Sequence, residues 1–264
     1  MENLTTVTPY IHRITIPYKD IYTSVFIIQT DCGTVLFDTA TLPEEMDAYV
    51  LPALDALGIP HDQLTCVVIS HNHRDHGGGL ARICQLFPGI TVAAGSDLCG
   101  ERIPGYPVRV VTDGETLLGP LTIVSIPGHT ADSIGVLDTR TKTLLPGDSL
   151  QLYGIYGSGD WGSNISYAPE HLAAVARLKQ KDIENIFAAH DYHPCGNCAQ
   201  GRDAVAQYID ACEEALMRLK EYILRYPELD DQALAAQFNA TANLPTLQVK
   251  VFRLLREAMS KGLV

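Results

Sequence analysis

The sequence is poor in positive charge and has no long apolar run. Lys and Arg together number 19 against 31 Asp and Glu, which gives a net charge of −12. This deficit argues against broad binding to the phosphate backbone of nucleic acids, which requires clustered positive charge, although a local basic groove remains compatible with it. No apolar stretch approaches the roughly 18–20 residues that a membrane-spanning helix requires, so we expect no membrane partner.

The beginning of the chain shows no export signal. Residues 1–20 are polar, are interrupted by Pro9 and Pro17, and lack a charged start followed by an apolar run. The seven cysteines are an odd number, and most of them lie inside apolar segments. This usage is typical of reduced thiols rather than of a disulfide framework, so we expect a cytoplasmic protein.

The order of the expected elements predicts an α/β protein with a C-terminal helical extension. Hydrophobic residues make up 46% of the chain, enough for a sizeable core. The expected strands are 10–16, 23–30, 34–38, 66–70, 108–111, 121–126, 134–138, 143–145 and 185–188, and the expected helices before residue 200 are 43–57, 78–87 and 168–179.

After about residue 200 the pattern is helical only. A helical stripe of apolar residues is followed by two shorter expected helices at 230–238 and 246–261. We therefore expect one α/β domain over residues 1–200 and a helical extension over residues 201–264. The extension can cap the core, contribute to substrate binding or pair two subunits into a homodimer. The stripe consists of Val205, Tyr208, Ile209, Cys212, Leu216, Leu219 and Ile223.

Three histidines and one aspartate lie within six residues, directly after the expected strand 66–70. They are His71, His73, Asp75 and His76. In an extended chain the first three point to one side, and the glycines at 77–79 supply the flexibility for a turn that sends His76 elsewhere. Such a loop can serve two metal ions, since imidazole and carboxylate ligands suit zinc and also iron or manganese. A solvated polar loop is the alternative that this clustering disfavours.

Other polar residues follow other expected strands. His129 follows strand 121–126, Asp148 follows strand 143–145, and His190 directly follows strand 185–188. Ligands at the ends of strands gather on one rim of a sheet, where loops can bring them together. Asp191 and His193 compete with His190 for the last position, and we prefer His190 because it comes directly after the strand.

With these motifs the sequence resembles the metallo-β-lactamase superfamily, whose signature is H-x-H-x-D-H followed by distant His, Asp and His ligands. The resemblance covers roughly residues 10–193. It implies a four-layer αββα sandwich with the site at one edge and two divalent metal ions, Zn²⁺ above all, with Mn²⁺ or Fe²⁺ as alternatives. The implied ligands are His71, His73 and His129 for one ion, and Asp75, His76 and His190 for the other, with Asp148 bridging both and Asp38 supporting the site from behind.

The implied chemistry is hydrolysis. Two cations about 3.5–4 Å apart lower the pKa of a shared water towards ~7 and polarise the attacked carbonyl or phosphoryl oxygen. Asp75 is a candidate proton carrier as well as a ligand, and Tyr153 and Tyr192 are candidate hydrogen-bond donors to an oxyanion. Tyr153 belongs to a stretch rich in glycine and aromatic residues, 151–167, which we expect to form part of the substrate wall or a lid.

The leading interpretation is a dinuclear metal-dependent hydrolase of a small ester-like substrate, such as a lactone, a thioester or a related acyl compound. One alternative is a phosphodiesterase or endoribonuclease-like enzyme, with Arg74, Arg102 and Arg109 as the basic residues near the rim. Another is a metal-binding interaction module without catalysis. β-Lactam cleavage is disfavoured, because resistance enzymes of this type usually carry an export signal and usually hold their second metal without an Asp-His pair.

A C-x-x-C motif lies shortly after the last expected ligand. Cys195 and Cys198 can form an extra metal or redox site, with His193 nearby. A structural zinc site needs four ligands, and the sequence has no second C-x-x-C. We therefore interpret the pair as reduced and incidental.

Overall fold

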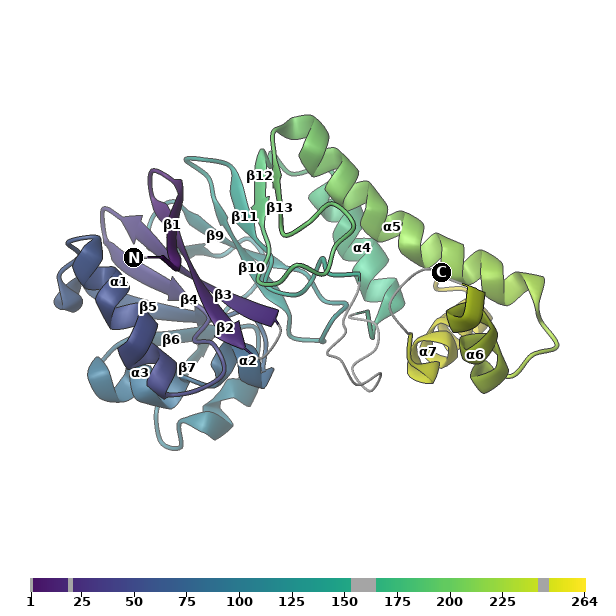
Figure 1. The fold of residues 1–264 in the computed structure, drawn as a ribbon, viewed down its shortest axis with the longest axis horizontal. Coiled ribbons are helices and arrows are strands. Elements are labelled where there is room, and N and C mark those ends of the chain that lie inside the picture. The colour runs from purple at the N-terminus through teal and green to yellow at the C-terminus, as the bar shows by residue number, and fades with distance from the viewer. Residues whose placement is uncertain (1, 19–20, 153–164, 242–246) are drawn as a thin grey trace. The chain divides into compact units, whose positions relative to one another are not determined.

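A computed structural model describes residues 2–18, 21–152, 165–241 and 247–264 (Figure 1). The chain divides into two units. The first consists of residues 1–125 and 134–141, and the second of residues 126–133 and 142–264. Among the described helices, none combines the length and the apolar character needed to cross a bilayer.

The first unit is built on a seven-stranded mixed sheet. The strands lie in sequence order, antiparallel from β1 to β4 and parallel from β4 to β7. The parallel part places the ends of β4 and β5 at the same edge. The strands are β1 (Leu4–Thr8), β2 (Ile11–Tyr18), β3 (Ile21–Thr30), β4 (Gly33–Phe37), β5 (Leu64–Ile69), β6 (Thr91–Ala94) and β7 (Val108–Val110).

Helices pack on one face of this sheet (Figure 1). Ile14, Ile27 and Ile69 of the sheet share a core with Leu54 and Ile83 of the helices, all 0% exposed. Alternation along a strand assigns the neighbouring residues to the opposite face, and these are buried as well, so the sheet is an interior layer. The helical elements are η1 (Met46–Val50), α1 (Leu51–Ala56), η2 (His61–Gln63), α2 (Arg74–Gly77), α3 (Leu80–Leu86) and η3 (Leu98–Arg102).

The first unit also contains a short antiparallel ladder, formed by β8 (Thr116–Leu117), β9 (Leu121–Ser125) and β10 (Ile134–Asp138). All five residues of β10 are buried. Where the structure describes the second unit, it contains the strands β11 (Thr143–Leu145), β12 (Asn185–Phe187) and β13 (Cys198–Gln200), paired parallel and then antiparallel. These strands place the residues after β11 and β12 at one edge.

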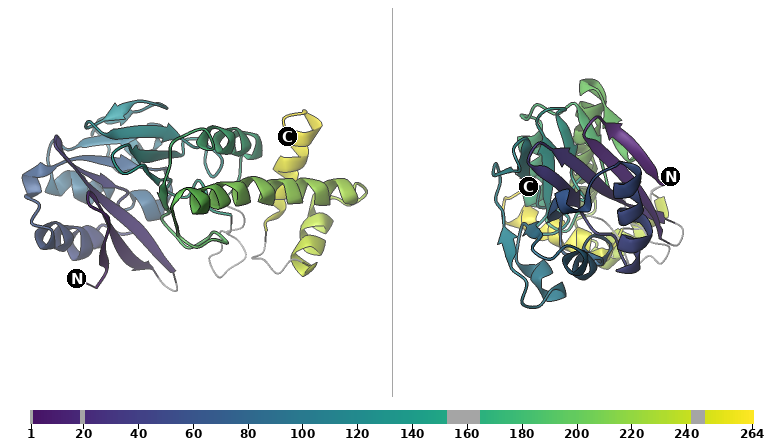
Figure 2. Two further views of the ribbon diagram at one scale, coloured as in Figure 1. Left: turned by 90° about the horizontal axis from the view of Figure 1, so that it is seen from above. Right: turned by 90° about the vertical axis from the view of Figure 1, so that its left-hand side faces the viewer.

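The described residues of the second unit also form four helices: α4 (Ala168–Leu178), α5 (Arg202–Arg225), α6 (Asp231–Thr241) and α7 (Val249–Ser260). Helix α5 lies beside α4, as Figure 2 shows from above. Its buried residues are the predicted stripe from Val205 to Ile223, member for member. Helices α6 and α7 pack together through Phe238 and Phe252, whose ring centroids lie 5.6 Å apart. Mixed sheets, the helices that cover them and this helical tail confirm the predicted α/β class and helical extension.

Candidate metal centre

The first ligand segment, His71–His76, begins where the buried strand β5 ends. The ring centroid of His71 lies 4.5 Å from that of His73 and 4.3 Å from that of His76. The ligand atoms of His71 and His73 lie within 4.8 Å of each other. The Nε2 atom of His76 and the Oδ2 atom of Asp75 are 3.6 Å apart. The segment thus forms two close pairs of metal-ligating groups.

The turn in this segment comes earlier than we expected. His73 is the last extended residue, with ψ of 155°, and Arg74–Gly77 form the helical turn α2. The N–H of Gly77 donates to the carbonyl of His73 at 3.0 Å. The prediction of an extended chain through Asp75 is therefore wrong. Because residues in a helical turn are rotated by about 100° from one to the next, Asp75 and His76 turn away from the direction of the extended pair before the glycines are reached.

The glycines after α2 permit close backbone approach rather than the turn itself. A Cβ atom on Gly78 would lie 2.0 Å from the carbonyl oxygen of Thr41, and one on Gly79 would lie 2.4 Å from that of Thr39. Their N–H groups instead donate to the carbonyls of Ala40 and Thr39, at 2.9 and 3.1 Å. These bonds tie the ligand segment to the chain that follows β4.

Asp38, directly after β4, supports this segment from a fully buried position. Its Oδ1 accepts the N–H of Ser70 at 2.7 Å, and its Oδ2 accepts the Ser70 hydroxyl at 2.8 Å. Oδ2 also lies 2.7 Å from Nδ1 of His76. A carboxylate can only accept, so the proton of the His76 ring is on Nδ1, and Nε2 carries the lone pair that a metal needs. Asp38 therefore fixes the tautomer and orientation of His76.

Two further residues hold the segment: Ser70, to which the sequence analysis gave no role, and Arg102, which it placed near the rim without a partner. The Ser70 hydroxyl lies 3.0 Å from Nδ1 of His71, and because it already donates to Asp38 it acts as the acceptor there. Arg102 donates from Nε to the side chain of Asn72 at 3.2 Å and from Nη2 to the Asn72 carbonyl at 2.9 Å. The position of Ser70, directly before the motif, was the available signal. No sequence pattern linked Arg102 to a residue thirty positions earlier.

The second unit holds the other candidate ligands around one carboxylate. Asp148 Oδ2 lies 3.7 Å from Nε2 of His129, and Asp148 Oδ1 lies 3.6 Å from Nε2 of His190. All three side chains are buried, with exposed fractions of 8% or less. Gln151 donates to Asp148 Oδ1 at 2.9 Å and orients the carboxylate. Each oxygen of Asp148 thus faces a different histidine, as a carboxylate that bridges two cations would require.

A turn that requires glycine presents His129. Gly128 adopts a left-handed conformation (φ 152°), and a Cβ atom there would lie 2.7 Å from the Cβ atom of His171. The Gly128 carbonyl accepts the N–H groups of Ser166 and Tyr167 at 2.7 and 2.8 Å. Only glycine fits this position without displacing α4, which explains the Gly-His order of the motif.

His193 does not compete with His190 for the site. Its Nδ1 accepts the N–H of Cys195 at 3.0 Å, and its Nε2 donates to the carbonyl of Tyr208 at 3.0 Å. Its ring stacks on that of Tyr208 with centroids 3.5 Å apart. His193 therefore anchors the loop after His190 to α5, whereas His190 faces Asp148.

The two candidate oxyanion donors have different outcomes. Tyr153 lies outside the described residues, as does most of the glycine-rich stretch to which it belongs. The Tyr192 ring lies 5.3 Å from the ring of His190, centroid to centroid, and the Tyr192 carbonyl accepts the N–H of Leu152 at 2.9 Å. The catalytic role of Tyr192 stays a prediction.

The C-x-x-C motif joins no further cluster of metal-ligating groups among the residues that the structure describes. Cys195 is exposed, Cys198 is half-buried, and both are free thiols, as are the other five cysteines. The interpretation of the pair as reduced and incidental stays a prediction.

The buried His193 makes stability depend on pH. Burial lowers the pKa of His193 from 6.5 to about 4, an effect that the hydrogen bond to the Tyr208 carbonyl partly offsets. Between pH 6.5 and 4 the His193 side chain therefore binds a proton in the unfolded chain but not in the folded chain. The resulting stability is fully present above pH 6.5 and is lost as the pH falls, by about 2–3 kcal/mol at pH 4.5.

This expectation is measured by urea unfolding at pH 7.5 and 4.5, with a chelator present so that metal release does not contribute. His193→Gln should lose less stability than the wild type between these two pH values. His61→Gln is the matched control, because His61 lies at the surface with 46% of its side chain exposed. Identical pH dependence in wild type and His193→Gln would contradict the assignment.

Comparison with known proteins tests the family resemblance that the sequence motifs predict. The family model described as "Metallo-beta-lactamase superfamily" matches residues 18–190. The chain is 30% identical to the "Uncharacterized protein YobT" of Bacillus subtilis over 151 residues, 49% of this chain and 62% of that one. It is 29% identical to a "Hydroxyacylglutathione hydrolase" of Synechococcus sp. over 160 residues, 59% of this chain and 60% of that one. The chain thus spans about three fifths of the length of these relatives.

A solved structure shows the same fold. The metallo-beta-lactamase FIM-1 from Pseudomonas aeruginosa, in its mono-zinc form, superposes with a TM-score of 0.60 at 21% identity. The superposition covers 80% of this chain and 95% of that one. It extends well beyond the ligand motifs, and it confirms the predicted sandwich.

Proposed function

Because the chain belongs to the metallo-β-lactamase superfamily, we propose that it is a metal-dependent hydrolase that cleaves a thioester. The observation that carries the hydrolase proposal is the Asp148 carboxylate, whose two oxygens face His129 and His190 at 3.7 and 3.6 Å. The thioester proposal is supported by the relatives named hydroxyacylglutathione hydrolase, at about 30% identity.

The proposed centre uses the seven ligands that the sequence predicts. His71, His73 and His129 would hold one cation, and Asp75, His76 and His190 the other, with Asp148 shared between them. Imidazole nitrogens and carboxylate oxygens are ligands that zinc favours, and Mn²⁺ or Fe²⁺ suit the same set. The fit is supported by the tautomer that Asp38 imposes on His76, since that tautomer directs the lone pair of Nε2 away from the buried carboxylate.

When bound, the two cations would supply the acidity that activates water and the positive charge that polarises the thioester carbonyl. The oxygen of water forms a bond to the acyl carbon, and the carbon–sulfur bond breaks. The proton from water passes to Asp75 and then to the departing thiolate, so that the products are a carboxylic acid and a thiol. Asp75 suits the transfer of this proton better than Asp148, because 25% of the Asp75 side chain is exposed, whereas only 7% of the Asp148 side chain is exposed.

The structure offers little support for the phosphodiester alternative. Of the three basic residues expected near the rim, Arg102 is engaged with Asn72 and Arg109 is paired with Glu115, whereas Arg74 is exposed at the start of α2. The guanidinium groups of Arg102 and Arg109 are thus already bonded to the protein. The cytoplasmic location and the homodimer through the C-terminal helices stay predictions.

The test is a substrate panel on protein whose bound metals have been quantified. We expect the protein to hydrolyse a hydroxyacylglutathione thioester or a simpler acyl thioester. Removal of the metal ions with a chelator should lower the rate about 10³-fold or more, and added Zn²⁺ or Mn²⁺ should restore it. A lactone and a phosphodiester serve as the comparison substrates. Hydrolysis of the phosphodiester alone, or full thioester hydrolysis by chelated protein, would overturn the proposal.

A further inference from the structure

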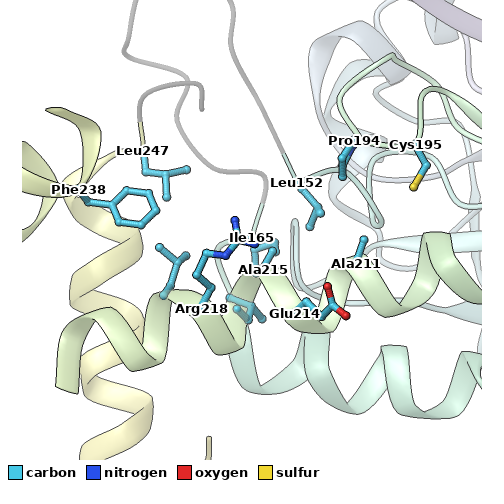
Figure 3. A pocket seen from close by; sticks show the side chains of 12 residues that line it. Leu152, Ile165, Pro194, Cys195, Ala211, Glu214, Ala215, Arg218, Phe238 and Leu247 are labelled. Carbon is cyan, nitrogen blue, oxygen red and sulfur yellow. The ribbon is translucent and has the colours of Figure 1, made fainter. Parts of the chain in front are cut away.

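A cavity of about 390 Å³ lies along α5 in the second unit (Figure 3). Nine of its twelve described lining residues are apolar. They come from helix α5, from helix α6, from positions 152, 165 and 247, and from Pro194 between β12 and β13. Its size falls within the range of small-molecule sites, and its lining is of the kind that binds apolar groups. The largest apolar side chains are those of Leu152, Ile165, Leu216, Leu219, Phe238 and Leu247.

The cavity begins beside the loop that carries His190. Pro194 and Cys195 line one end of it, and Phe238 and Leu247 line the other (Figure 3). Leu152 donates its N–H to the carbonyl of Tyr192, two residues after His190. Two lining residues thus follow a candidate ligand by four positions along the chain, Leu152 after Asp148 and Pro194 after His190, so that one end of the cavity lies beside this part of the proposed centre.

The charges at the cavity favour an uncharged occupant. Among the described residues that line the cavity, Glu214 and Arg218 are the charged ones, and both are exposed. They lie one helical turn apart on α5 and carry opposite charges, so that this side of the cavity has no net charge. The rest of the lining would leave a carboxylate or an ammonium group without a partner, at a high desolvation cost.

We propose that this cavity binds the hydrocarbon chain of an acyl thioester, which makes the enzyme selective for acyl groups of medium length. This inference rests on the proposed function only where it places the thioester carbonyl. The binding of the hydrocarbon chain to the cavity does not depend on that function. The lining residues of α5 run from Ala211 to Leu219, a span of about 12 Å at the rise of an α-helix. That length suits an extended alkyl chain and far exceeds an acetyl group.

The first experiment measures chain binding without catalysis. The neutral fluorescent probe N-phenyl-1-naphthylamine is bound to the full chain and displaced with 1-butanol, 1-hexanol, 1-octanol and 1-decanol. Each added methylene should tighten binding about fourfold until the cavity is full. Ala215→Trp, which places a large ring in the cavity, should weaken binding of 1-octanol at least tenfold. The same substitution at the exposed Ala206 of α5 is the matched control and should leave binding unchanged.

A second variant guards against misfolding. Ala211→Phe fills the other end of the same helix face and should also weaken binding of the longer alcohols. Both variants are compared with the wild type by circular dichroism. If folded Ala215→Trp and Ala211→Phe bind 1-octanol as the wild type does, or if affinity is independent of chain length, the proposal is overturned.

The second experiment links the cavity to turnover. With acetyl, hexanoyl and octanoyl thioesters of one thiol, KM should fall with chain length in the wild type, and Ala215→Trp should raise KM for the octanoyl substrate alone. Equal KM values for all chains in the wild type would contradict the role of the cavity in substrate selection. Chain binding without hydrolysis by metal-loaded protein would refute the proposed function while leaving the cavity assignment in place.

Discussion

Replacement of Asp148 with Asn is expected to cost at least about 10³-fold in thioester hydrolysis. The physical reason is the position of this carboxylate, with one oxygen toward His129 and the other toward His190. The amide removes the negative charge and turns one of the two oxygens into an NH₂ group, which cannot act as a ligand. We therefore expect the variant to retain at most one metal ion per chain, measured by elemental analysis alongside the initial rate.

The matched control is Asp182→Asn in the same unit. Asp182 is exposed, and its carboxylate pairs with Lys142 and Arg202 on the surface, so both metal content and rate should match those of the wild type. An Asp148→Asn protein that holds two metal ions and keeps its rate would show that this carboxylate bridges nothing. A fall in rate with an unchanged metal content would restrict its role to catalysis.

Asp38→Ala is expected to lower the free energy of unfolding by about 3–5 kcal/mol. The Asp38 carboxylate holds three polar hydrogens, two from Ser70 and one from His76, and all of these groups are buried. Alanine would leave them without this acceptor. It would also have to adopt the left-handed backbone that Asp38 occupies at φ 66°, which an aspartate or asparagine tolerates more readily.

Asp38→Asn separates stability from metal binding. Asparagine keeps the size and the backbone preference of Asp38 but loses its charge, so we expect a smaller loss of stability and a 10–100-fold loss of metal affinity. Urea unfolding of the metal-free proteins and competition with a chromophoric chelator measure the two effects. Asp47→Asn, an exposed carboxylate paired with Arg82, is the control and should change neither quantity. Wild-type metal affinity in Asp38→Asn would argue that Asp38 does not orient His76.

Much of the fold could be predicted from the sequence alone, because the local patterns agree with the tertiary structure. The strands around β2 to β5 are rich in β-branched residues, and the apolar stripe of α5 is buried at every predicted position. Where no such pattern exists, prediction failed: the four-residue turn α2 contains neither an apolar period nor a capping side chain. Its conformation comes from hydrogen bonds with the segment at 39–41, which a reading of the local sequence could not reveal.

What the sequence predicted by itself about the site was a set of seven candidate ligands. Their positions after strands favoured this set, because loops at the ends of strands can gather side chains at one edge. Tertiary structure decided the rest. The tautomer of His76 depends on Asp38, 38 residues away, and the engagement of His193 depends on the backbone of α5. The cavity along α5 likewise requires side chains from several separate segments. Contacts of this kind depend on how the elements pack against one another, so the local sequence does not predict them.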